Sequence, residues 1–243
     1  MTVALPLGFA ETLAALLLAH VLADFVFQTA WMVRHKRNVF VLLLHIALVF
    51  ALTTATTGGV WEVAVPVALS HLIIDIFKTY APRHLRETLA AFLLDQAAHL
   101  ATLIAAAWLW PRTLQAGELA PWASDLLLPM VLLSGFVLTV LAGGHVVGLL
   151  TRKYTGQIQQ DGLPDAGRVI GQLERTLIFL LIWLDQPAGI GFLIAAKSIL
   201  RYDTTAQQKA GEYVIIGTLA SFTWALAVGY GTLGLLEILS TRP

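Results

Sequence analysis

The 243-residue chain contains no cysteine and little charge. Without cysteine it can form no disulfide, no thiolate metal site and no cysteine nucleophile. Charged residues make up 12% of the sequence and hydrophobic residues 58%, whereas a soluble domain carries roughly 25% charged residues. So little charge cannot cover a water-exposed surface. The formal net charge is zero, so the sequence does not predict a nucleic acid as a partner.

The first ten residues also lack lysine and arginine, so the charged start of a secretory signal peptide is missing. We therefore expect the first apolar run to be a retained transmembrane helix. Together, the apolar runs predict an all-α fold, a polytopic transmembrane helix bundle with seven or eight membrane segments. The predicted helices are Leu7–Met32, Val39–Thr54, Trp61–Thr79, Thr88–Trp110, Leu126–Leu150, Val169–Leu184, Pro187–Leu200 and Tyr213–Glu237.

The sixth and seventh predicted helices are short, because Asp185, Pro187 and Gly189 interrupt one apolar stretch. This segment is either two short crossings or a re-entrant hairpin, and periodicity does not decide between them. We expect two halves. Residues 1–112 form a four-helix half that bears histidine and aspartate, and residues 113–243 form a C-terminal half with the short broken helix pair.

Basic residues follow alternate predicted helices, in the segments 34–37, 78–86, 152–168 and 197–209. Because cytoplasmic loops carry an excess of lysine and arginine, we assign these segments to the cytoplasmic side. The sequence then predicts a multi-pass protein of the bacterial inner membrane with membrane lipid as its partner. It does not indicate an oligomeric state.

Histidine and aspartate recur at a spacing of four residues in the first hundred positions. Residues four apart lie on the same face of a helix. Counted from the cytoplasmic ends at about 1.5 Å per residue, most of these groups lie roughly 10–17 Å deep. Four separate helices thus bring polar groups to similar heights. The residues are His20 and Asp24, His71 and Asp75, Asp95 and His99, with His45 on the second helix.

Energetics favour a metal ion at this place. A carboxylate at the centre of a transmembrane helix costs about 2.5–3.5 kcal/mol, so these groups must face partners inside the bundle. We expect Lys78 to reach Asp75, and no lysine or arginine at the depth of Asp24, Asp95 or His99. Nitrogen and oxygen ligands without sulfur favour a divalent metal: zinc first, with manganese or iron as alternatives. One ion or two sharing an aspartate would fit, and a proton or ion relay and a purely structural cluster are the competing interpretations.

The pattern assigns roles to particular residues. Asp24 or Asp95 is the predicted catalytic general base. The predicted metal ligands are His20, Asp24, His45, His71, Asp75, Asp95 and His99. The predicted substrate contacts are Gln28, Lys78, Gln96, Glu174, Arg175, Lys197, Arg201 and Glu212. For Lys197 and Arg201 the alternative is that they extend to lipid headgroups, and for Glu212 that it stabilises a helix N-terminus.

Three runs, His20–Gln28, Ser70–Lys78 and Leu94–His99, resemble a bacterial membrane family catalogued as domain of unknown function 3307. Segments 170–175, 190–201 and 212–219 resemble the C-terminal portion of its longer members. The resemblance implies no activity. A looser similarity links the chain to small membrane proteins labelled metal-dependent hydrolases. The family resemblance implies that His20, Asp24, Gln28, His71, Asp75, Lys78, Asp95, Gln96 and His99 occupy motif positions.

The leading functional hypothesis is a membrane-embedded metal-dependent hydrolase that acts on a lipid or lipophilic substrate from the cytoplasmic side. A transporter of divalent cations, or one coupled to protons, is the first alternative, because polar groups near the midplane and a broken helix are typical of that class. A non-catalytic membrane subunit with a structural metal is the second.

Overall fold

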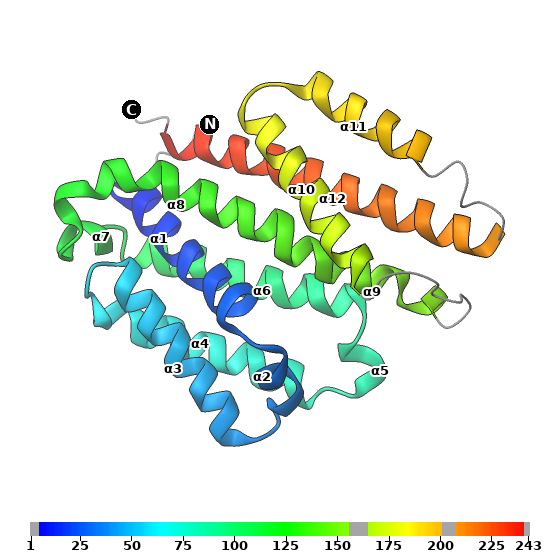
Figure 1. Ribbon diagram of the computed structural model, residues 1–243. Coiled ribbons are helices and arrows are strands. Elements are labelled where there is room, and N and C mark those ends of the chain that lie inside the picture. The colour runs from blue at the N-terminus through cyan, green and yellow to red at the C-terminus, as the bar shows by residue number, and fades with distance from the viewer. Residues whose placement is uncertain (1–4, 156–164, 201–207, 241–243) are drawn as a thin grey trace. The chain divides into compact units, whose positions relative to one another are not determined.

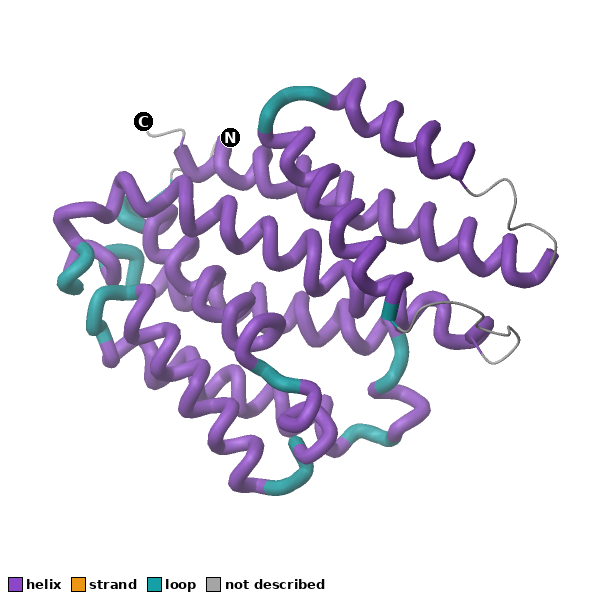
Figure 2. The backbone as a smooth tube through the Cα atoms, viewed as in Figure 1, coloured by secondary structure: helices purple, strands orange, loops and turns teal. Residues whose placement is uncertain are grey.

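The computed structural model describes residues 5–155, 165–200 and 208–240, apart from the side chains of residues 198–200 and 208–210. Every regular element in these ranges is helical (Figures 1 and 2). The chain divides into two compact units, one formed by Met1–Val137 with Leu235–Pro243 and the other by Leu138–Gly234. Each unit is described by itself.

The first unit is built around its N-terminal helix. All residues of α1 from Glu11 to Val21 are buried, and the helix packs against α3, α6 and α8. At its N-terminal end Gly8 has φ +83°, and a Cβ there would lie 2.6 Å from the Pro111 carbonyl oxygen, so only glycine fits. The elements are α1 (Phe9–Val21), η1 (Leu22–Phe27), α2 (Ala30–His35), α3 (Val39–Thr56), α4 (Trp61–Tyr80), α5 (Arg83–Arg86), α6 (Leu89–Leu109), α7 (Thr113–Ala116), η2 (Ala120–Trp122) and α8 (Ala123–Val137).

The first predicted helix is not continuous. After α1 the chain widens into the π-helical segment η1, and Gln28, with ψ 98°, turns the backbone to an extended conformation. The Thr29 hydroxyl then accepts a hydrogen bond from the Met32 backbone N–H at 3.2 Å and starts α2 as an N-cap. Asn38 caps α3 in the same way through the Phe40 N–H. The prediction of one helix over Leu7–Met32 was therefore wrong, because local capping outweighs the apolar periodicity.

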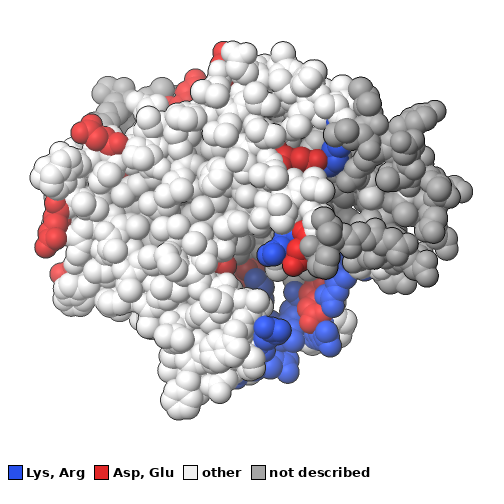
Figure 3. Space-filling model, in the orientation of Figure 1, with Lys and Arg blue, Asp and Glu red and all other residues white. Residues whose placement is uncertain are grey.

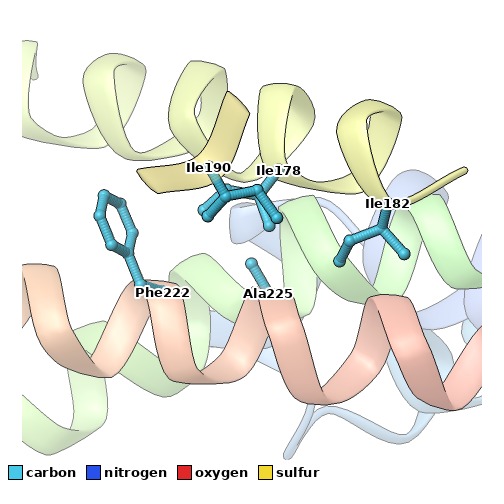
Figure 4. Packing of buried hydrophobic residues seen from close by; sticks show 5 residues of the cluster. All are labelled: Ile178, Ile182, Ile190, Phe222 and Ala225. Carbon is cyan, nitrogen blue, oxygen red and sulfur yellow. The ribbon is translucent and has the colours of Figure 1, made fainter. Parts of the chain in front are cut away.

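The second unit contains η3 (Leu138–Ala142), α9 (Gly143–Thr155), α10 (Ala166–Trp183), α11 (Pro187–Leu200) and most of α12 (Gln208–Ser240). Its apolar core lies between α10, α11 and α12. Gly229 lets α12 approach α10 closely, because a Cβ there would lie 2.6 Å from Ile182 Cδ1 and the isoleucine would have to shift. Figure 4 shows the core residues Ile178, Ile182, Ile190, Phe222 and Ala225.

Six helical segments in the described ranges are long and apolar enough to cross a membrane, which suggests a membrane protein. The predicted total of seven or eight is not confirmed. Three charged residues interrupt the 18 residues of α10, and the 14 residues of α11 span only about 21 Å. The six segments are Phe9–Phe27, Val39–Thr56, Trp61–Tyr80, Leu89–Leu109, Ala120–Thr155 and Gly211–Ser240.

The predicted boundary near residue 112 differs from the division into compact units. The first unit continues to Val137, because α8 packs along α1. The predicted broken pair at 169–200 forms the helices α10 and α11, joined at Leu184–Gln186, where the Gln186 N–H donates to the Leu181 carbonyl at 2.8 Å.

Candidate metal centre

Seven side chains from five helical elements of the first unit lie together and are named here the His/Asp cluster. Six of them expose 7% of their surface or less, and the Asp24 side chain exposes 10%. The spacing of four residues within α4 and within α6 places one histidine and one aspartate on the same helix face. The cluster consists of His20 on α1, Asp24 on η1, His45 on α3, His71 and Asp75 on α4, and Asp95 and His99 on α6.

Four atoms form the centre of the His/Asp cluster. His45 Nε2 lies 3.1 Å from His71 Nε2, 3.2 Å from Asp24 Oδ1 and 3.5 Å from Asp75 Oδ2. His71 Nε2 lies 3.3 Å from Asp24 Oδ1 and 3.6 Å from Asp75 Oδ2. Four ligands bound 2.0–2.1 Å from a tetrahedral zinc ion are separated by roughly 3.3–3.4 Å. The five distances are close to five of the six edges of such a tetrahedron.

Hydrogen bonds alone do not account for this grouping. An imidazole nitrogen carries at most one proton and can donate it toward one acceptor at a time. His45 Nε2 nevertheless faces two carboxylate oxygens, another imidazole nitrogen and the Gln28 side-chain amide nitrogen at 3.0 Å. A cation between them would satisfy the two imidazole nitrogens and the two carboxylate oxygens at once, and the Gln28 amide would then donate elsewhere.

The outer atoms of several cluster residues are held by neighbours. Asp75 Oδ1 accepts a hydrogen bond from Lys36 Nζ at 2.7 Å, and Asp95 Oδ2 accepts one from Lys78 Nζ at 2.5 Å. His99 Nδ1 lies 2.8 Å from the Asp95 backbone carbonyl, so Nδ1 carries the proton and Nε2 keeps its lone pair. Metal-binding imidazoles are usually oriented through their second nitrogen in this manner.

Six polar atoms of the cluster are buried and make no hydrogen bond within the described ranges. A buried polar atom without a partner costs about 1–3 kcal/mol, so several in one place indicate that a ligand belongs there. The atoms in the cluster are His20 Nδ1, Asp24 Oδ1, His45 Nδ1, Asp75 Oδ2, Asp95 Oδ1 and His99 Nε2.

Asp75 belongs to two potential ligand groups. It combines with His45 and His71 in one group and with Asp95 and His99 in another, each with ligand atoms within 4.8 Å of one another. A third group joins His20, Asp24 and His71. The shared aspartate fits the predicted alternative of two ions with a bridging carboxylate.

The glutamines named as substrate contacts lie beside the cluster. Gln96 Oε1 is 3.3 Å from His20 Nε2, and the Gln96 amide donates to Asp95 Oδ2 at 3.1 Å. Gln28 contacts His45, as described above. Gln96 therefore orients His20 and Asp95, whereas the Gln28 amide faces His45 Nε2, one of the four central atoms.

The prediction of which lysines pair with the cluster aspartates was wrong. Lys78 pairs with Asp95 on the neighbouring α6 and not with Asp75 on its own helix, and Lys36 is the partner of Asp75. Lys36 was predicted only as part of the basic segment 34–37 on the cytoplasmic side. The chain turns after η1, and this turn brings Lys36 next to Asp75. Hydrophobic periodicity does not predict such a turn. Of the three aspartates, Asp24 has neither lysine nor arginine as an ion-pair partner among the described residues.

The substrate contacts predicted in the C-terminal half lie in the second unit or outside the described residues. Lys197 Nζ pairs with Glu174 at 2.5 Å, so the ammonium already has a counter-charge. Arg175, 2% exposed, donates to the Val140 carbonyl through Nε and Nη2 at 3.1 and 2.9 Å and to Ser221 Oγ at 3.0 Å. Glu212 is exposed on α12, and Arg201 lies outside the described residues.

Comparison with known proteins agrees with the motif resemblance in the N-terminal part. Residues 12–122 match the model of a family described as protein of unknown function (DUF3307). The matched segment is just under half of the chain and contains the whole His/Asp cluster. Neither the curated proteins nor the solved structures give a match.

Proposed function

We propose that the His/Asp cluster, which lies in the segment matching this family, is the metal centre of a membrane-embedded hydrolase. The observation that carries the proposal is the group of four atoms from Asp24, His45, His71 and Asp75, with five mutual distances of 3.1–3.6 Å. Two imidazoles and two carboxylates are a ligand set that suits zinc, with manganese or iron as alternatives.

The remaining cluster residues suit a second ion or the handling of protons. Asp95 and His99 each present a buried atom without a hydrogen bond in the described ranges, and Asp75 can be shared between both places. A bound divalent ion would lower the pKa of a water molecule and polarise the scissile group. With Asp24 among the four central atoms, Asp95 is the better placed of the two predicted general bases.

The apolar helices support a membrane location. Because cytoplasmic segments are rich in lysine and arginine, we propose that the cluster lies toward the cytoplasmic side of a bacterial inner membrane. A substrate that reaches this depth is lipophilic, so we propose a lipid. Transport is supported less well. Residues 13–19 of α1 are leucine and alanine and are all buried, so this central helix offers an ion no polar side chain between Thr12 and His20.

The test begins with metal content. Protein purified in detergent without added chelator is compared with the double variant His45→Asn, His71→Asn by elemental analysis. We expect about one or two ions per wild-type chain and near-complete loss in the double variant, because two of four ligands are gone. The exposed His84, changed to asparagine, is the matched control and should keep the wild-type content.

A second measurement separates an enzyme from a structural site. Membrane lipids are incubated with metal-loaded wild type and with the double variant, and the products are identified by mass spectrometry. Hydrolysis products that depend on the metal support the proposal. Equal metal content in both proteins, or bound metal without any product, would contradict it.

A further inference from the structure

The end of the first unit nearest the His/Asp cluster is basic. In Figure 3 lysine and arginine gather over α2 and α5, while much of the visible surface is uncharged. Only Glu87 offsets them in the segments 34–37 and 78–87, and Arg83 pairs with it at 2.8 Å. The basic residues are Arg34, Lys36, Arg37, Lys78, Arg83 and Arg86.

Two of these cations connect the surface to the cluster. Lys36 and Lys78 each bond a cluster carboxylate, and their side chains retain 14% and 35% exposure. An ammonium group has three donors, and each of these two makes one hydrogen bond within the described ranges. Donors therefore remain for a ligand that enters from the basic end.

The net charge of the metal-loaded site favours an anionic ligand. Three cluster carboxylates face two ammonium groups, and a single divalent ion makes the site net positive before the arginines are counted. Lysine ammonium groups beside a metal ion are a common means of holding phosphate. A neutral or cationic substrate would leave the positive charge without compensation.

Large apolar side chains surround the same end. Phe27 and Trp31 are about half exposed, and Phe40 and Phe77 expose 78% and 76% of their surface. They neighbour Gln28, Lys36 and Lys78 in the chain. Aromatic residues beside lysine and arginine are typical of the boundary between acyl chains and headgroups. This end can therefore accept an anion attached to an apolar tail.

Building on the proposed function, we propose that the substrate of the metal centre carries a phosphate group, which Lys36 and Lys78 hold against the metal. The phosphate belongs to a lipid headgroup or to a free phosphate compound. Both share the chemistry that the two ammonium groups recognise.

The test uses full-length protein loaded with Mn²⁺, whose bound amount is measured first. Paramagnetic broadening of the ³¹P signal then reports a phosphate close to the ion. The probes are inorganic phosphate and a short-chain phosphatidic acid, each titrated below its aggregation limit. We expect saturable broadening by the wild type. Stronger binding of phosphatidic acid identifies a lipid headgroup, and equal binding identifies free phosphate.

The variants Lys36→Gln and Lys78→Gln, singly and together, should bind the phosphate at least tenfold more weakly per bound Mn²⁺. Arg83→Gln is the control, because its side chain is 75% exposed and pairs with Glu87. Bound Mn²⁺ without broadening, or unchanged broadening in both single variants and the double variant, would overturn this inference alone. A wild type that binds no metal ion would instead overturn the proposed function.

Discussion

Both units bury charged side chains, but they satisfy them differently. In the second unit Glu174 pairs with Lys197, and Arg175 donates three hydrogen bonds to oxygens of its own unit. In the first unit six buried polar atoms make no hydrogen bond within the described ranges, whereas the second unit has one such atom, Thr139 Oγ1. Buried charge alone therefore does not indicate a ligand site. The indication is a group of buried polar atoms that make no hydrogen bond within the described ranges.

The largest effect is expected where a satisfied pair in the second unit is broken. Lys197→Met removes the ion-pair partner of the buried Glu174 carboxylate. The free energy of unfolding should fall by about 3–5 kcal/mol. Adding Glu174→Gln should recover most of that loss, because no unpaired charge remains. Unfolding in detergent micelles, followed by circular dichroism, measures both.

The exposed Lys153, changed to methionine, is the matched control and should shift stability by about 0.5 kcal/mol or less. Metal content should stay unchanged in all these variants. If Lys197→Met alone and Lys197→Met with Glu174→Gln are equally stable, the ion pair between Lys197 and Glu174 is not what stabilises this unit.

The first unit should respond to metal and the second should not. Zinc at about one hundred times its dissociation constant should stabilise the wild type by about 2.7 kcal/mol, and a chelator should reverse the gain. His71→Asn should remove the response, because His71 Nε2 is one of the four central atoms. Thermal unfolding in detergent, with and without zinc, is the measurement. A response that persists in His71→Asn would place the ion elsewhere.

A smaller effect is expected from a residue that only orients a ligand. Lys78→Gln removes the ammonium group that orients Asp95. It should lower the affinity for zinc by about tenfold, or roughly 1.4 kcal/mol. Arg83→Gln, which alters an exposed pair, should leave it unchanged. Titration with a competing zinc indicator distinguishes the two. Identical affinities in both variants would mean that Lys78 does not tune the cluster.

Much of the helix pattern could be predicted from sequence. The predicted span Val39–Thr54 became Val39–Thr56, and Trp61–Thr79 became Trp61–Tyr80, because long apolar runs bounded by polar loops leave little choice. The meeting of His71 and Asp75 with residues from other helices could also be inferred, since spacing and depth both follow from helix geometry.

What escaped prediction depends on irregular backbone and on contacts between helices. The π-helical segment η1 and the turn at Gln28 follow no hydrophobic period, and together they bring Asp24 and Lys36 toward the cluster. His45 was predicted as a ligand although it has no aspartate four residues away, and its Nε2 lies at the centre of the four-atom group. A lone histidine has no sequence signal beyond its own helix, so only the folded neighbours reveal its role.

The position of α1 also has a consequence for biogenesis. This helix is synthesised before α3, α6 and α8, which complete its burial, and α8 begins only at Ala123, long after α1 ends at Val21. Until α6 has been inserted, His20 lacks the neighbouring ring of His99, 4.9 Å away in the finished structure. Under the proposed function, the four central ligands Asp24, His45, His71 and Asp75 are all synthesised before α6, so a first ion can bind before Asp95 and His99 complete the cluster.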